Sequence, residues 1–375
     1  MSAKKAPKIS VLFASSLKPI LDSRSHGRLG LSLRETNKYE LNFIGFSSKR
    51  PSKTAKHRFF VSITDYHSRW QRLFFPWRFA YLLLKIKPKI LICSTWEILP
   101  VAKFLKGWMG YKLIYDVQEN YVENLKLNPG LSSFKRALAS KLIRFAQKPS
   151  SIDYFLLAEA CYAQEMPDKK PYLILENKYL GIIEEIQEKS YSGKRSFNFL
   201  ITGTLSPAYG TREGIDFFKN IVADFPNSTL TILGHVPIKS FEKELQEKVK
   251  NTPSIFLHIS ENPIPHLEII EALKKADFLL LPYEIHPAIQ RKIPSKLFEA
   301  NALGCPVIIS SNQLWEEWIS GQSSGISINF SNLDQGRKDF LKGISKPFFT
   351  TYNPEQILWK KEGNLFRELL DRLLA

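Results

Sequence analysis

Residues 290–307 bring together a helix start, several cations and one carboxylate. Pro294 and Ser295 stand where a helix can begin, because proline is well suited to the first helical position. The free N–H groups of such a first turn attract anions, and Arg291 and Lys296 add positive charge for a pyrophosphate. Glu299 follows about one turn later, where a carboxylate can accept hydrogen bonds from a ribose diol. This spacing predicts a nucleotide diphosphate site; an ordinary capped connection with solvated charges is the alternative.

A second candidate lies directly after an apolar run over residues 197–202. Gly203 permits a close approach of the backbone to a ligand, and Thr204 adds a hydroxyl group. Arg212, a little further along the chain, could pair with a phosphate. A tight turn followed by a solvated arginine explains these residues equally well.

Further polar residues follow two apolar runs in the first half of the chain. Asp116, Gln118 and Glu119 come after the run over residues 112–116, and Gln118 can hydrogen-bond a sugar hydroxyl but cannot act as an acid or base near neutral pH. His26 and Arg28 follow the first run. For Asp116 and Glu119 the alternative is capping of a strand end. For His26 and Arg28 the alternative is a solvated basic turn.

The elements that must position these residues alternate between strands and helices. The predicted strands span residues 8–15, 39–46, 58–63, 89–94, 112–116, 197–202, 229–233, 255–259, 278–281 and 307–310. The predicted helices span residues 26–37, 73–87, 97–109, 132–147, 214–225, 240–251, 265–276 and 295–303, and an amphipathic helix is expected over 354–374. Such alternation is typical of an α/β fold with doubly wound parallel sheets, whose ligands lie beyond the carboxyl ends of the strands. The length favours two domains, joined near residues 181–196.

Composition excludes several classes of protein. A hydrophobic content of 44% is too high for a disordered basic tail. The three cysteines, Cys93, Cys161 and Cys305, lie far apart, so neither a disulfide framework nor a structural zinc site is indicated. The histidines show no metal-ligand spacing, and no P-loop, GxGxxG, GxSxG or HExxH pattern is present.

The segment over residues 294–308 resembles the signature of retaining glycosyltransferases of the GT-B fold, family 4 and its relatives, which reads approximately Pro-Ser-Lys-Leu-Phe-Glu and then Gly-x-Pro-Val-Ile. Other parts match in order: Gly203-Thr204, the strand end Leu230–Gly234, and Ala276-Asp277 before an apolar run. The resemblance implies two Rossmann-like domains facing a central cleft. It implies an acceptor-side domain over residues 1–185, a nucleotide-sugar domain over 196–353, and a helix over 354–375 that crosses back to the first domain.

The resemblance also implies roles for residues. Glu299 is expected to bind the nucleotide ribose, and the first-turn amides of Ser295, Lys296 and Leu297 to hold the diphosphate. Gly203, Thr204 and Arg212 are expected near the donor, and Arg291, Lys296 and Gln118 near the reaction centre. His26, Arg28, Asp116 and Glu119 are expected on the acceptor side. Neither a cofactor nor a metal is expected.

The chain departs from the family pattern at three positions. Arg291 stands where relatives carry a second glutamate, Thr204 where many carry a basic residue, and Gln118 where many carry a histidine. The predicted function is transfer of a sugar, with retention, from a nucleotide diphosphate sugar to a glycan or lipid-linked acceptor in polysaccharide or glycoconjugate synthesis. The alternatives are a non-catalytic GT-B-like scaffold protein and, with less support, a sugar-nucleotide epimerase.

Charge is distributed unevenly along the chain. Residues 1–150 hold 28 basic and 8 acidic side chains, whereas residues 151–375 hold 25 and 28. Aromatic residues between Trp70 and Tyr81 alternate with arginines in this basic half, which favours contact with an anionic membrane surface, while a sheet-covering helix with core aromatics is the alternative. No nucleic-acid motif is visible, so nucleic acid is not an expected partner. Lys4 and Lys5 before an apolar run resemble a leader peptide, but a first strand fits that run better, and the expected location is the cytoplasm, at the inner face of the membrane.

Overall fold

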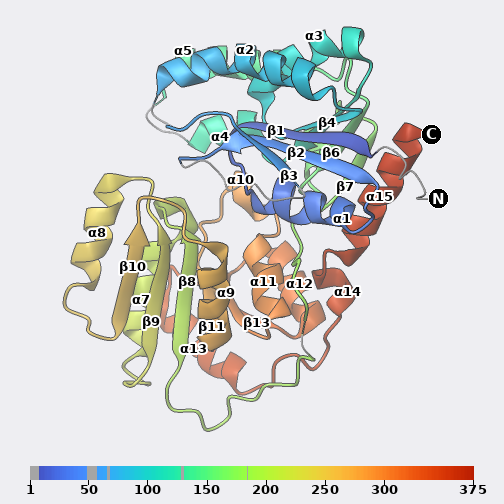
Figure 1. The fold of residues 1–375 in the computed structure, drawn as a ribbon. Coiled ribbons are helices and arrows are strands. Elements are labelled where there is room, and N and C mark those ends of the chain that lie inside the picture. Colours follow the sequence, from blue (N-terminus) through green and yellow to red (C-terminus); the bar gives the residue numbers. More distant parts are fainter. Residues whose placement is uncertain (1–7, 49–56, 66–67, 128–130, 184) are drawn as a thin grey trace. The chain divides into compact units, whose positions relative to one another are not determined.

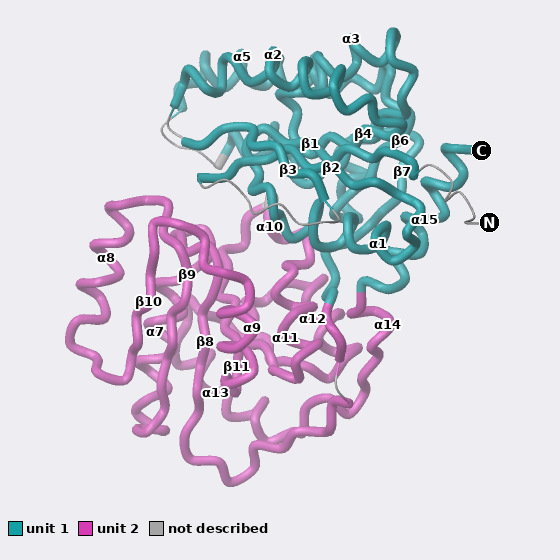
Figure 2. The backbone as a smooth tube through the Cα atoms, in the orientation of Figure 1, with its two compact units in different colours: residues 1–180, 359–375 teal, residues 181–358 magenta. Residues whose placement is uncertain are grey.

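The computed structural model describes residues 8–48, 57–65, 68–127, 131–183 and 185–375, so the leader-like Lys4 and Lys5 lie outside the described residues. The chain divides into two units. Unit 1 comprises residues 1–180 together with 359–375, and unit 2 comprises residues 181–358 (Figure 2).

Unit 1 is built on a parallel sheet of seven strands in the order β3-β2-β1-β4-β5-β6-β7. These strands are β1 (Ile9–Pro19), β2 (Tyr39–Phe46), β3 (His57–Val61), β4 (Ile90–Cys93), β5 (Lys112–Val117), β6 (Tyr154–Leu157) and β7 (Tyr172–Ile174). The central strands are apolar on both faces because helices cover both sides, as expected for a doubly wound sheet. The strand order changes direction between β1 and β4, which is where such folds place ligands.

The two faces of this sheet carry different helices (Figure 1). Helices α2 (Arg69–Ile86) and α3 (Leu99–Met109) supply apolar side chains to the core on one face, and α5 (Ser133–Ala146) lies in the same layer. The other face is covered by the π-helical turn η1 (Ser23–Gly30), α1 (Leu31–Arg34) and α15 (Lys360–Leu374). The short helices α4 (Tyr121–Asn124) and α6 (Tyr162–Glu165) complete unit 1. The C-terminal helix thus returns to the first unit, as the sequence predicts.

Unit 2 contains a parallel sheet of six strands in the order β10-β9-β8-β11-β12-β13. The strands are β8 (Asn198–Thr204), β9 (Thr229–His235), β10 (Ile255–Ser260), β11 (Phe278–Leu281), β12 (Val307–Ser310) and β13 (Gly325–Ile328). The helices are α7 (Thr211–Ile221), α8 (Lys239–Val249), α9 (His266–Lys275), α10 (Pro287–Gln290), α11 (Ser295–Ala302), α12 (Gln313–Gln322), α13 (Leu333–Ile344) and α14 (Pro354–Ile357). The order has the Rossmann pattern, and its change of direction falls between β8 and β11.

Three predicted elements need correction. The helix expected over residues 26–37 is a π-helical turn followed by a short α-helix, because buried contacts of its arginines hold the backbone there. The helix expected over 97–109 begins at Leu99 after a 3-10 turn. The helix expected over 354–374 is interrupted at Leu358 and Trp359, where the backbone N–H of Trp359 donates to the Tyr179 carbonyl.

The sequence analysis also missed several elements, namely β6, β7, β13, α12 and α13. Within the ranges that the structure describes, no helix is long and apolar enough to span a membrane.

Candidate functional site

The change of strand order in unit 2 lies beside Gly203. This residue ends β8 with a φ of +99°, a conformation that favours glycine. A Cβ atom at this position would lie 2.5 Å from Cε and 2.6 Å from Nζ of Lys296. The glycine therefore lets the lysine side chain lie directly against the backbone at the end of β8.

Lys296 belongs to the first turn of α11, and its ammonium donates to the hydroxyl of Tyr283 over 3.1 Å. Burial disfavours the charged form, but the Tyr283 hydroxyl and the Glu299 carboxylate outweigh that effect and raise the pKa of Lys296 above its ordinary value. The side chain is therefore a cation at neutral pH. An ammonium has three N–H bonds, and Tyr283 is its only hydrogen-bond acceptor among the described residues, so two N–H bonds can still meet anionic oxygens.

The segment after β11 is fixed by close packing against the turn that follows β8. Tyr209 and Tyr283 lie with their ring centroids 4.9 Å apart. Gly210 has a φ of +63°, and a Cβ atom there would lie 1.6 Å from the Pro282 carbonyl oxygen, so no other residue fits without movement of the backbone. This packing places Tyr283 where it orients Lys296.

Glu299 is buried in α11, with 7% of its surface exposed. One of its oxygens lies 2.9 Å from Nε2 of His266, the first residue of α9. A half-exposed imidazole against a buried carboxylate leaves the second carboxylate oxygen able to accept a further hydrogen bond. Glu299 is thus held in position without being fully satisfied.

The start of α11 carries the remaining predicted residues of this unit. The Leu297 amide donates to the Pro294 carbonyl over 2.9 Å, so it is already engaged. The amides of Ser295 and Lys296 precede it in the first turn and have no partner within the helix. Of the three predicted first-turn donors, these two are therefore better placed to meet an anion.

The two predicted arginines of unit 2 differ in what they contact. Arg212 lies on α7, forms two hydrogen bonds with Glu244 of α8, and covers the ring of Phe241. Arg291 is exposed on the segment between α10 and α11. Thr204 is the last residue of β8 and is partly buried beside Gly203.

The predicted residues of unit 1 lie near one another but serve mostly internal contacts. Asp116 is fully buried and pairs with Arg24, whose Nε lies 2.9 and 3.0 Å from its two oxygens. The Gln118 amide donates to Asp116 over 2.8 Å, and Glu119 pairs with Lys18. Sequence reasoning placed Arg24 with His26 and Arg28 on a basic turn but did not predict its pairing with Asp116, which lies 92 residues away in the chain.

Arg28 and His26 are held on the turn after β1. Arg28 donates to the carbonyls of Lys178 and Asn177 over 2.6 and 3.1 Å, and it is buried. His26 lies against the rings of Phe43 and His57, with centroid distances of 5.1 and 5.7 Å. Burial and the nearby Arg34 lower the pKa of His26, so it is neutral at neutral pH.

Sequence reasoning missed further residues around Lys296 and Glu299. The sequence analysis assigns no role to His266, whose side chain contacts Glu299. Its position at the start of a helix that follows a strand was the available signal, since such starts lie at the carboxyl edge of the sheet. Tyr209 and Tyr283 gave no comparable signal in the sequence.

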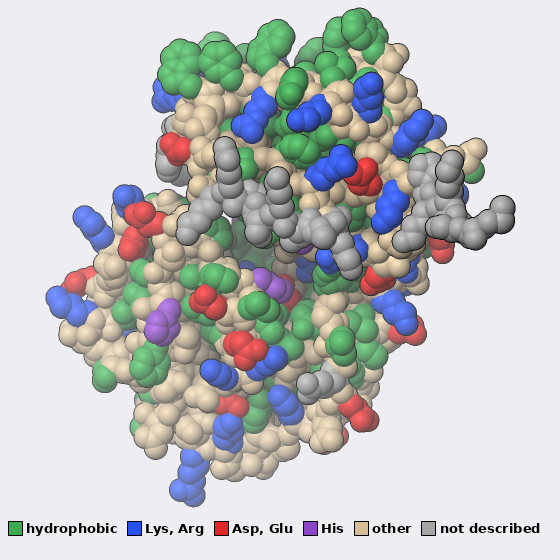
Figure 3. All heavy atoms as spheres, in the orientation of Figure 1, with side chains coloured by type: hydrophobic (Ala, Val, Ile, Leu, Met, Phe, Trp, Pro, Cys, Tyr) green, Lys and Arg blue, Asp and Glu red, His purple; other side chains and the backbone are tan. Residues whose placement is uncertain are grey.

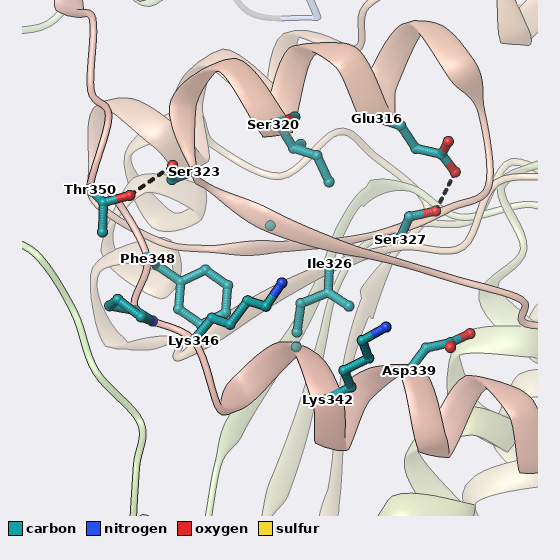
Figure 4. Close-up of a pocket in the computed structure, with 14 residues that line it drawn as sticks. Glu316, Ser320, Ser323, Ile326, Ser327, Asp339, Lys342, Lys346, Phe348 and Thr350 are labelled. Atoms are coloured by element: carbon teal, nitrogen blue, oxygen red, sulfur yellow. Dashed lines mark hydrogen bonds between the residues drawn. The ribbon is translucent and has the colours of Figure 1, made fainter.

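A hollow of about 640 Å³ lies elsewhere on unit 2, between α12, β13 and α13 (Figure 4). Lys342 and Lys346 line it, and Glu316 accepts a hydrogen bond from Ser327 at its other end. None of the predicted site residues lines this hollow. No group of three or more His, Cys, Asp or Glu side chains suited to a metal ion occurs in the described part of the chain.

Comparison with known proteins defines the class first. The fold is similar to that of sucrose-phosphate synthase from Thermosynechococcus elongatus, with a TM-score of 0.66, 12% identity, and coverage of 98% of this chain and 100% of that one. It is also similar to Alr3699/HepE of Anabaena in complex with UDP and glucose, with a TM-score of 0.62, 13% identity, and coverage of 97% and 100%. The chain therefore has the GT-B fold of glycosyltransferases, with two Rossmann-like domains.

The sequence then indicates the family. Residues 182–346 match the family profile described as "Glycosyl transferases group 1". The uncharacterized glycosyltransferase MJ1059 of Methanocaldococcus jannaschii is 26% identical over 259 residues, a match that covers 61% of this chain and 58% of that protein. The matched segment lies within unit 2 and includes Gly203, Lys296 and Glu299.

Proposed function

We propose that the protein transfers a sugar from a nucleotide diphosphate sugar to a glycan or lipid-linked acceptor, with retention and without a metal ion. The observation that carries this proposal is the group formed by Gly203, Lys296 and Glu299 at the change of strand order in unit 2. The group combines the Lys296 ammonium, which has unused N–H bonds, with the buried Glu299 carboxylate, which has an unused oxygen. Gly203 adds a backbone position that carries no side chain. These three features suit a diphosphate, a ribose diol and a closely approaching ligand.

In this mechanism, Lys296 stabilises the diphosphate as it leaves. Negative charge grows on the leaving oxygens as the bond to the sugar breaks, so a fixed cation and aligned amides bind the transition state more tightly than the ground state. The amides of Ser295 and Lys296 contribute in the same way, and Leu297 supports the turn. Arg291, exposed beside the same helix, is proposed to add charge at the phosphates.

Glu299 is proposed to bind the ribose, with His266 holding the carboxylate in position. Thr204 is proposed to contact the donor next to Gly203. Arg212 is a weaker candidate, because it would have to leave Glu244 before it could reach a phosphate. The departure from the family pattern at residues 204 and 291 supports a donor different from that of most relatives.

We further propose that unit 2 holds the donor and unit 1 meets the acceptor. Gln118 and Glu119 are partly buried side chains at the carboxyl end of β5, where they can contact an acceptor or the donor sugar. His26 follows β1 of the same sheet. Arg28 and Asp116 are buried and stabilise this edge of the sheet through their internal contacts. Alr3699/HepE is in complex with UDP and glucose, which supports a sugar nucleotide as the donor class. The setting proposed is polysaccharide or glycoconjugate synthesis, in the cytoplasm at the inner face of a membrane.

A thermal-shift panel of nucleotides and sugar nucleotides tests the proposal. One sugar nucleotide should raise the Tm of the wild type, because a ligand that binds only the folded state stabilises it. The same compound should release its nucleoside diphosphate when acceptor is present. Binding by none of the compounds would contradict the proposal.

A scaffold protein without catalytic activity is the second candidate. Arg291 in place of a family glutamate and Gln118 in place of a family histidine favour it. The scaffold predicts silence across the panel, or binding of a nucleotide without any release of nucleoside diphosphate.

A further inference from the structure

Helices α2, α3 and α5 of unit 1 expose large apolar side chains on the side that faces away from the sheet. Figure 3 shows these side chains gathered along the edge of unit 1 that carries the three helices. They lie on all three helices and are at least 48% exposed: Trp70, Leu73, Phe74, Trp77, Tyr81, Leu84, Phe104, Trp108, Phe134, Leu138, Leu142 and Phe145. We call this set the outer aromatic face. Isolated exposed apolar residues are ordinary, but this many large ones on three helices of one layer are not.

The exposed residues recur at helical spacing. In α2, Trp70, Phe74, Trp77 and Tyr81 follow one another every three to four residues, while Phe75 and Phe79 are buried against the sheet. In α5, Phe134, Leu138, Leu142 and Phe145 form a similar stripe. Helix α2 is therefore apolar on two opposite sides, of which only one is used by the core. Sequence reasoning treated the aromatics of α2 as one set, and the structure divides them.

The charges on the three helices indicate which kind of partner binds the outer aromatic face. Helices α2, α3 and α5 contain ten Lys and Arg residues and no Asp or Glu. Arg69, Arg72 and Arg78 are exposed and form no ion pair with any residue that the structure describes. Tryptophan, phenylalanine and basic side chains on one surface are the composition of helices that lie in the interface of an anionic bilayer. A second copy of the same face would bring Arg69, Arg72 and Arg78 of two chains together, which argues against self-association.

The way in which α2, α3 and α5 pack together suits a partner with a flat surface. Lys103 of α3 donates to the carbonyls of Ala146 and Lys148 over 2.7 and 2.6 Å, which ties α3 to the end of α5. Helices α2 and α3 contribute buried residues to one common core cluster. The three helices therefore form one connected layer, whose exposed side chains can enter a bilayer surface together.

We propose that the outer aromatic face binds the surface of an anionic lipid bilayer. Its meaning for catalysis rests on the proposed transfer to a lipid-linked acceptor, because the face would hold unit 1 where such an acceptor lies. Membrane binding itself requires neither donor nor transfer. The experiments can therefore show which of the two proposals fails, membrane binding or sugar transfer.

Cosedimentation of the full chain with vesicles tests the proposal. The wild type should bind vesicles of phosphatidylcholine mixed with phosphatidylglycerol, and binding should weaken with salt and with phosphatidylcholine alone. The triple variant Trp77→Ser, Trp108→Ser, Phe134→Ser removes one exposed aromatic from each helix and should weaken binding at least about tenfold. The variant Arg69→Glu, Arg72→Glu, Arg78→Glu should lose binding to the anionic vesicles as well.

Matched controls come from unit 2. The variant Ile182→Ser, Leu267→Ser, Ile285→Ser removes three similarly exposed apolar side chains and should bind vesicles as the wild type does. The variant Lys243→Glu, Lys275→Glu, Lys338→Glu makes the same change of charge and should retain most of the binding. Sedimentation of each variant without lipid shows whether the face mediates self-association instead.

Three results would overturn the proposal. The first is that the wild type does not bind anionic vesicles at low salt. The second is that the aromatic variant and its control lose binding equally. The third is that the wild type is a dimer which the aromatic substitutions convert to a monomer. If every variant unfolds with the Tm of the wild type, a general loss of structure is excluded. Nucleotide-dependent stabilisation should persist in the aromatic variant, because the proposed donor site lies in unit 2.

Discussion

Both sheets change strand order beside their first strand, at β1 and β4 in unit 1 and at β8 and β11 in unit 2, and polar side chains gather at each place. In unit 1, Arg24 donates to both oxygens of Asp116 and to the Leu175 carbonyl, and its Nη2 lies 2.8 Å from Oδ1 of Asp116, so the two charges are paired within the chain. In unit 2, Lys296 has a single acceptor and Glu299 a single partner among the described residues. The same position in the same topology thus serves the fold in one unit and leaves bonding capacity for a ligand in the other.

The comparison yields a rule for reading charged residues in such folds. A buried charge that is paired with an opposite charge within the chain is a structural element, whereas a fixed charge with few internal partners is a candidate ligand contact. The rule predicts that substitutions at the unit 1 position reduce stability, and that substitutions at the unit 2 position reduce ligand affinity.

Asp116→Ala should have the largest effect on stability. It leaves the Arg24 guanidinium buried without its partner, and breaking a buried pair in this way costs about 3–5 kcal/mol. Asp224→Ala is the matched control, because Asp224 and Arg337 form an ion pair at the surface of unit 2, where such pairs contribute about 0–1 kcal/mol. Denaturant unfolding measures both, and equal losses would contradict the structural role of Asp116.

Lys296→Met should weaken the affinity for a nucleoside diphosphate by about 10- to 150-fold, the range for loss of a hydrogen bond to a charged group. Because the pKa of Lys296 is raised, its ammonium persists as the pH rises, and wild-type affinity should stay constant between about pH 7 and 9. Calorimetric titration measures both expectations. Lys275→Met, at the end of α9, is the control; a loss of affinity in the control alone would contradict the account.

Glu299→Gln should weaken nucleoside diphosphate binding about tenfold while the affinity for inorganic pyrophosphate stays the same. The reason is that the carboxylate is assigned to the ribose and not to the phosphates. His266→Ala should show a smaller loss in the same direction, because His266 only positions the carboxylate. Competition titration with the two ligands separates these effects, and an equal loss for both ligands would remove the ribose assignment.

Arg212→Gln should have the smallest effect. The side chain is paired with Glu244 at the surface, so nucleotide affinity should change by less than about twofold and stability by less than about 1 kcal/mol. The same titration and unfolding measurements check both values. A large loss of affinity would mean that Arg212 leaves Glu244 to bind the donor.

The sequence predicted the strands well where apolar runs were long and bounded. The bounds of β2, β11 and β12 agree with the prediction, because runs of Ile, Leu, Val and Phe mark strands that are buried on both faces. The short strand β7 and the alternating strand β13 lack that signal. The turn after β1 could not be predicted, because the contacts of Arg24 and Arg28 reach residues about 90 to 150 positions away.

The candidate site was predicted only in part. The helix start at Ser295 and the position of Glu299 depend on local spacing, so the sequence indicates them directly. The contacts of Lys296 with Gly203 and of Glu299 with His266 depend on how strands and helices pack, and no local pattern encodes them. The outer aromatic face was predicted only in part, because the sequence marks the aromatics between Trp70 and Tyr81, while only the packing of α2 separates the exposed from the buried ones.

Calorimetric titration of the stabilising sugar nucleotide into wild type, Lys296→Met and Asp116→Asn tests the central claim most directly. The account predicts tight binding to the wild type, binding weakened at least about tenfold in Lys296→Met, and nearly wild-type affinity in Asp116→Asn at a temperature where that variant is folded. Unchanged affinity in Lys296→Met, together with a large loss in Asp116→Asn, would contradict it.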